Sequence, residues 1–259
     1  CAMTTSSISA RSVLTVGLQQ IALAAVVFVL VVLWLQIPDA NAFEVFASVV
    51  LALLIALLTG AGECAIALGL IGRRFTARSM CVGTCVVLVA AFFWWLLSAV
   101  IDHVSANDAL RAGYWNSRFP ASLRNVFTFE HLVVWLGWGW SLLRYVIAGL
   151  VAAAAFAVIA SGSPVRATLA IWGSIRYWVF LLLFVVVGAI VTDTLIGWTP
   201  GHGIRVELLS LAARLLLVIL LNAATVALLM QSMAHAVLRT QAVGGVDPVT
   251  SHPRTEDMP

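Results

Sequence analysis

Four ionisable side chains lie inside long apolar stretches of the sequence: Glu63, Arg144, Asp193 and Arg214. At the centre of a membrane helix such a side chain costs about 2.5–3.5 kcal/mol on insertion scales, so each one should face protein or water and find a partner. We therefore interpret these four residues as the candidate substrate-binding or ion-binding positions. Oppositely charged residues at one depth can also serve a purely structural purpose as buried ion pairs.

The positions of these residues along the stretches predict which charges meet. With the side of the two termini taken as the inner side, Glu63 falls in the inner half of the second stretch and Arg144 near the middle of the fourth. Asp193 and Arg214 fall in the outer halves of the fifth and sixth stretches, which would be antiparallel neighbours. The depths therefore predict an Asp193–Arg214 pair and make Glu63 the nearest acid to Arg144. This structural interpretation is favoured over a functional one.

The transport hypothesis rests on a correspondence between the two acids. If the chain is an inverted three-plus-three repeat, Glu63 and Asp193 occupy matching places on the second and fifth stretches. Glycines precede both acids, namely Gly60, Gly62 and Gly188. Helices that are interrupted by glycine and carry the binding residues are a recurring plan in transporters. The two halves share no convincing sequence identity, so the hypothesis depends on these few positions.

A second candidate site consists of histidines beside acids on the outer side. His103 follows Asp102, His131 follows Glu130, and His202 lies in a turn rich in glycine and proline. Imidazole and carboxylate groups together can hold a transition metal. No spacing forces these residues to converge, so ordinary interfacial histidines are favoured over a metal site. No cofactor is predicted, because the sequence lacks phosphate-loop, His-Glu-x-x-His, Gly-x-Ser-x-Gly and Cys-x-x-Cys motifs.

The elements that must position these residues follow from hydropathy. The chain has 259 residues, of which 63% are hydrophobic and 10% charged, and its mean hydropathy is +1.07. A bilayer whose hydrocarbon is roughly 30 Å thick needs about 20 apolar residues for each spanning helix. Six stretches satisfy this length, so the sequence predicts an all-α bundle of six transmembrane helices. The predicted spans are residues 13–35, 43–70, 80–101, 132–160, 177–198 and 206–233.

The remaining segments are short. Residues 1–12 are predicted to be a cytoplasmic tail, in which residues 1–2 are an added remnant before a native Met3. Residues 13–234 are predicted to form the six-span domain, and residues 235–259 a disordered cytoplasmic tail. The third connection has Phe119, Leu123 and Phe127 at helical spacing, and the fourth has Pro164 at a helix start. Both patterns predict short amphipathic helices in the membrane interface.

Arginines predict the orientation. Eight arginines lie in the segments on the side of the termini and four on the opposite side, so the positive-inside rule makes both termini cytoplasmic. We expect a multi-pass protein of a bacterial-type inner (plasma) membrane. A small permease-like transporter and a membrane-embedded subunit of a larger assembly are the leading hypotheses, and a metal-dependent membrane enzyme with an outward His/carboxylate site is the alternative. Expected partners are membrane lipid, other membrane subunits or further copies of the chain, and no nucleic acid.

Overall fold

The computed structural model describes residues 10–38, 40–198 and 203–244, and it is helical between short connections in those residues. Six of its helices are long and apolar enough to cross a membrane. The predicted all-α, six-span fold is therefore confirmed, and the chain has the architecture of a multi-pass membrane protein. The helices are α1 (Ala10–Leu35), α2 (Ala42–Leu70), α3 (Ala77–Ser105), α4 (Asp108–Arg118), α5 (Ala121–Arg124), α6 (Phe129–Ala160), α7 (Pro164–Trp172), α8 (Ile175–Val185), η1 (Val186–Val191), α9 (Thr192–Gly197) and α10 (Ile204–Gly244).

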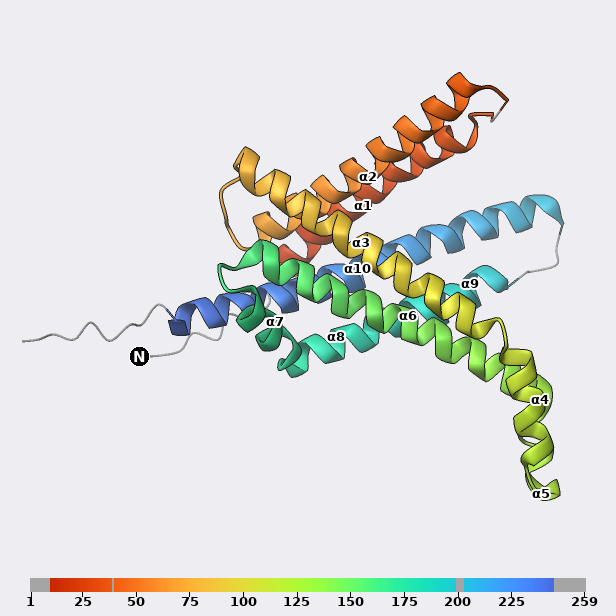
Figure 1. Ribbon diagram of the computed structural model, residues 1–259. Coiled ribbons are helices and arrows are strands. Elements are labelled where there is room, and N and C mark those ends of the chain that lie inside the picture. The colour runs from red at the N-terminus through yellow and green to blue at the C-terminus, as the bar shows by residue number, and fades with distance from the viewer. Residues whose placement is uncertain (1–9, 39, 199–202, 245–259) are drawn as a thin grey trace, which may run out of the picture.

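The fifth span is composite, because α8, η1 and α9 follow one another without a break and η1 is a π-helical segment. The sequence did not predict this segment. The sixth span, α10, continues past the predicted span end at Met233 and past His235 to Gly244. The inner ends of the helices, including the start of α1 and the end of α10, lie at one end of the bundle (Figure 1).

The two predicted connecting helices are present, but one of them lies elsewhere. Helix α7 begins at Pro164, as predicted. In the outer connection the longer helix is α4, which precedes the predicted segment, and α5 is only a single turn. Pro120 explains the difference, because a proline disfavours helical backbone at the residue before it. Phe119 and Phe127 instead stack with their ring centres 4.7 Å apart.

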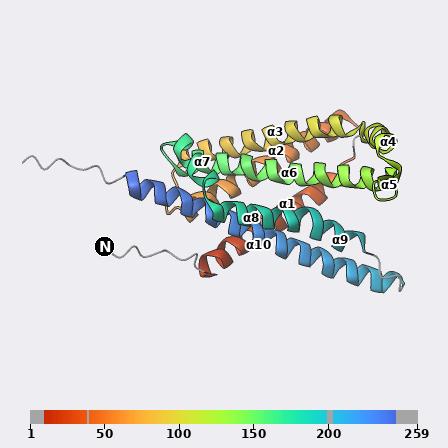
Figure 2. The ribbon, with the colours of Figure 1, turned by 90° about the horizontal axis from the view of Figure 1, so that it is seen from below.

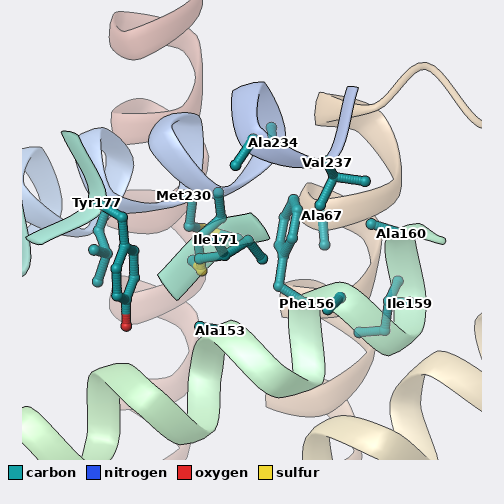
Figure 3. Close-up of a cluster of buried hydrophobic side chains, with 14 of the residues drawn as sticks. Ala67, Ala153, Phe156, Ile159, Ala160, Ile171, Tyr177, Met230, Ala234 and Val237 are labelled. Atoms are coloured by element: carbon teal, nitrogen blue, oxygen red, sulfur yellow. The ribbon is translucent and has the colours of Figure 1, made fainter. Parts of the chain in front are cut away.

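The apolar core lies in the inner half of the bundle. Buried side chains cluster at the inner ends of α2, α6, α8 and α10 and on one face of α7. Figure 3 shows Ile171 of α7 lying among Met230, Phe156 and their neighbours from α10 and α6. Ile171 and Tyr177 are each 0% exposed. These contacts fix the inner ends of four spans against the short helix that connects two of them.

The helices separate toward the outer side. Figure 1 shows the α1–α2 hairpin diverging from the α3–α6 pair and from the N-terminal half of α10, and Figure 2 shows α10 and α9 running apart from α3 and α6 toward the end where α4 lies. Large apolar side chains are exposed along most of this length, among them Phe28, Phe46 and Leu209. Such surfaces are stable only in contact with lipid or with another apolar molecule.

A glycine of α3 faces a buried cysteine of α2. A Cβ atom at Gly83 would lie 2.2 Å from the Sγ atom of Cys64 and 3.4 Å from its Cβ atom. Cys64 is fully buried and has only one side-chain torsion, so its sulfur has little room to withdraw. Small residues at such a contact let membrane helices pack closely.

We predict that Gly83→Ala destabilises the protein by about 1–3 kcal/mol, the usual cost of overpacking. Adding Cys64→Ala should restore most of the loss, because the remaining 3.4 Å contact is ordinary. Thermal unfolding in detergent, followed by tryptophan fluorescence, measures both effects. Gly139→Ala in α6, where a Cβ meets nothing within 4 Å, is the matched control. Equal melting temperatures for Gly83→Ala and Gly139→Ala would contradict this packing.

Candidate functional site

The four intramembrane charges do not converge on one site. Arg144 forms a close ion pair with Asp102, near the end of α3, and not with Glu63. Helix α6 has 32 residues, which is about 48 Å of helix against roughly 30 Å of hydrocarbon. The middle of α6 therefore need not be the middle of the membrane. The expectation based on depth was wrong for this pair, because it assigned Asp102 to a loop.

Arg214 also lacks its expected partner. Its Nη1 donates to the carbonyl oxygen of Leu195 at 2.9 Å, and its Nε donates to the carbonyl of Ser210 at 3.1 Å. Its guanidinium carbon lies 5.5 Å from the centre of the Trp198 ring. Within the described residues no ion pair joins Arg214 to Asp193. The arginine is 9% exposed, and it links α10 to α9 through carbonyls and an indole.

Glu63 is held by a glutamine from the first span. The Nε2 atom of Gln20 donates to Oε2 of Glu63 at 2.9 Å and approaches the sulfur of Met230 at 3.4 Å. Gln20 is 9% exposed and Glu63 is partly buried. Glu63 lies seven residues before the end of α2, about 10 Å along the helix axis. It forms no ion pair among the described residues.

An apolar cavity of about 300 Å³ adjoins Glu63. Its lining comes from α2, α3, α6, α8 and α10, and Glu63 is its one charged residue. Small residues, including Ala91, Gly149 and Ala152, line much of the wall, together with the aromatic residues Trp94, Phe156 and Phe184. A cavity with apolar walls and one carboxyl group that accepts a single hydrogen bond favours the binding of a proton or of a cationic, partly apolar molecule.

Asp193 lines a second cavity, of about 320 Å³, between α6 and the composite fifth span. Ser141, Tyr145 and Thr192 are its other polar residues of note. The hydroxyl of Tyr145 donates to the carbonyl of Gly188 in η1 at 2.9 Å. A Cβ at Gly188 would lie 2.5 Å from the Tyr145 ring, so only glycine fits there. Short π-helical segments occur often at functional sites.

One aromatic contact lies between the two cavities. Phe184 lines the Glu63 cavity, Tyr145 lines the Asp193 cavity, and their rings meet edge to face with centres 5.6 Å apart. One ring contact therefore links the lining of the Glu63 cavity to the lining of the Asp193 cavity. Arg144 and Arg214 belong to neither lining.

The histidine site finds no geometric support in the described residues, where no three His, Cys, Asp or Glu side chains lie close enough to share a metal ion. The Nδ1 atom of His131 lies 3.1 Å from the carbonyl oxygen of Val126, and its ring stacks near Trp135. His103 lies in the last turn of α3. His202 lies outside the described residues.

Sequence reasoning missed three residues of the site. Gln20 had a usable signal, because it is a polar residue inside an apolar stretch and such residues seek partners across helices. Tyr145 and Phe184 had none, because aromatic residues occur in each of the first five spans. Searches of protein-family models, curated proteins and solved structures find no match to this chain.

We predict that Gln20→Leu destabilises the protein by about 1–3 kcal/mol, because it leaves a partly buried carboxyl without its donor. The double variant Gln20→Leu/Glu63→Leu should recover stability, because two apolar groups need no partner in this surrounding. Thermal unfolding in detergent gives the coupling energy. Gln19→Leu, at the exposed neighbouring position, is the control and should cost nothing. A Gln20→Leu effect no larger than that of Gln19→Leu would show that the hydrogen bond is not formed.

Proposed function

We propose that the protein is a permease-like transporter for a small organic cation that is partly apolar. The observation that carries the proposal is the pair of neighbouring cavities, each with one acid, on the two sides of the Tyr145–Phe184 contact. Secondary transporters hold their substrate and coupling-ion sites inside the helix bundle and open them alternately to the two sides of the membrane. Two cavities that each hold an acid and meet at one ring contact are suited to such a mechanism. Separation of these rings would join the cavities.

The chemistry of the first cavity supports an organic cation over a metal ion. Divalent metal ions such as Ca²⁺ and Mg²⁺ take six or more oxygen ligands, whereas Glu63 is the one carboxylate of this lining and most of the wall is alanine, valine and aromatic. Trp94 and Phe184 offer ring faces that attract a positive charge. A proton competes with the cation for the same carboxylate, which provides a means of coupling.

Location in the membrane is part of the proposal. The arginines of the described chain favour an inner side at the terminal end of the bundle, with both termini cytoplasmic in a bacterial-type inner membrane. Seven lie at helix ends or connections on that side, and four on the other. The first group is Arg11, Arg73, Arg74, Arg78, Arg166, Arg176 and Arg239, and the second is Arg111, Arg118, Arg124 and Arg205.

A second function is favoured by the small residues of the first cavity. Ala91, Ala148, Ala152 and Ala155 line it, and small residues let a partner helix approach closely. A membrane-embedded subunit, or a further copy of the chain, would place a helix there. In that case Glu63 would bond to the partner and not to a transported molecule.

We predict that tetraphenylphosphonium binds the purified protein and that Glu63→Gln lowers its affinity at least tenfold, because the substitution keeps the shape and removes the charge. Wild-type affinity should fall as the pH is lowered, since protons compete for the carboxylate. Equilibrium binding of the radiolabelled cation measures both effects. Glu130→Gln, at an exposed acid of α6, is the control. Absence of tetraphenylphosphonium binding, or equal affinity of the wild type and Glu63→Gln, would contradict the transporter proposal and favour the subunit function.

We also predict that Phe184→Ala makes the protein leaky, because it removes one half of the ring contact between the cavities. Proteoliposomes should then release tetramethylammonium, an organic cation that does not cross lipid readily by itself, down its gradient several-fold faster than wild type, without a proton gradient. Phe180→Ala, one turn earlier in α8 and outside both linings, is the control. Identical release from all three proteins would show that the aromatic pair does not separate the compartments.

A further inference from the structure

A third cavity, of about 520 Å³, lies at the inner side between α7, α8 and α10. Three arginines line it, one from each helix: Arg166, Arg176 and Arg239. His235 also lines it, with Nε2 3.4 Å from Nη1 of Arg176. No carboxylate belongs to the lining. A pocket with three guanidinium groups and no acid is suited to an anion with several oxygen atoms.

The charge around this cavity remains uncompensated within the described chain. The two ion pairs found there, Arg111–Asp108 and Arg144–Asp102, are both on the outer side. Every described carboxylate except Glu63 also belongs to the outer half. Arg166, Arg176 and Arg239 therefore have no acidic partner among the described residues. A positive pocket of this kind gains the most by binding an anion.

The inner core fixes the backbone from which the three arginines extend. Each is close in sequence to a buried residue: Arg166 precedes Ala167, Arg176 precedes Tyr177, and Arg239 follows the buried Val237 by two positions. Ala167, Tyr177 and Val237 belong to the core cluster that joins α7, α8 and α10, part of which Figure 3 shows. The three arginine side chains themselves are exposed, so they are open to a ligand at the surface.

The beginning of α8 adds backbone donors to the same cavity. Ser174 is the N-cap residue of this 11-residue helix, and its side chain makes no capping hydrogen bond. Ser174, Ile175 and Arg176 all belong to the lining. The free N–H groups and the helix dipole at such an end favour a phosphate group. This adds to the three guanidinium groups and supports an oxyanion over a simple halide.

Exposed apolar side chains lie on the same two helices as Arg166 and Arg176. Val165 and Leu169 of α7 are 73% and 61% exposed, and Ile175 of α8, which lines the cavity, is 79% exposed. Trp172 and Trp178 are joined by a hydrogen bond from the Trp178 Nε1 atom to the Trp172 carbonyl at 2.6 Å. Exposed aliphatic and tryptophan side chains on a short helix are typical of the membrane interface. Such helices are suited to contact with lipid acyl chains.

We propose that the cavity between α7, α8 and α10 binds a phosphate group, presented by the headgroup of an anionic phospholipid of the inner leaflet. Basic pockets between membrane helices at the cytoplasmic side are suited to such headgroups. The site is separate from the cavities of Glu63 and Asp193, so it does not depend on transport. A bound lipid would bridge α7, α8 and α10 and stabilise the inner end of the bundle.

The experiment uses the full chain, delipidated in neutral detergent. Phosphatidylglycerol, phosphatidylcholine and inorganic phosphate are titrated separately, and the rise in melting temperature and the lipid adducts in native mass spectrometry are measured. We predict that phosphatidylglycerol binds and stabilises, and that phosphatidylcholine does so far less. Arg166→Gln/Arg176→Gln should weaken phosphatidylglycerol binding by about fivefold for each arginine removed.

Two variants keep the result interpretable. Arg74→Gln removes an exposed arginine of the same side that lies outside the lining, so it should lower affinity less than twofold. Arg176→Lys keeps the positive charge and should retain most of the phosphatidylglycerol binding. The loss in the double variant is then assigned to the missing charges and not to misfolding. Equal phosphatidylglycerol binding by wild type and the double variant would overturn the site. Stabilisation by inorganic phosphate, with no preference between the two lipids, would overturn the phospholipid as its source.

Discussion

The packing of the inner ends of the helices is the constraint on which the rest of this structure depends. Buried side chains of α2, α6, α8 and α10 meet there around the short helix α7, and Ile171 and Tyr177 are completely enclosed. Toward the outer side the same helices separate and expose their apolar faces. The Asp193 cavity lies between α6 and the outer part of the fifth span, whereas the Glu63 cavity adjoins the inner core, because Ala67, Phe156 and Met230 belong to both. In lipid these exposed faces carry no penalty.

The four charges within the spans have different surroundings. Arg144 has an acid partner, whereas Arg214 is surrounded by backbone carbonyls and an indole ring. Glu63 has a single amide donor, and Asp193 has no ion-pair partner among the described residues. The basic residues are thus neutralised or solvated by the protein, while both acids remain available at cavities. This asymmetry is the physical basis for proposing that a cation, and not an anion, passes through the bundle.

The inner end combines the tightest packing with the strongest positive charge. The proposed phosphate site uses both, because the core packs together the three helices that carry the arginines. An anionic lipid held there would reinforce the contacts that keep the spans together, and it would leave the outer ends free to move. Binding at the inner surface and the separation of the aromatic pair would then act on different parts of one bundle.

The sequence by itself determined the number of spans, the start of α7 and the four charges that lie within the spans, because hydropathy and proline act locally along the chain. It did not determine which charges meet. Arg144 pairs with Asp102, which α3 carries because it continues as a helix to Ser105, past the predicted span end. Span depth alone does not reveal the offset between neighbouring helices. The donor to Glu63 and the ring contact between the cavities also arise between helices that are distant in sequence. Only tertiary structure decides such contacts, because they depend on the rotation and tilt of each helix. The apolar sequence pattern of a helix that faces lipid constrains its rotation and tilt only weakly.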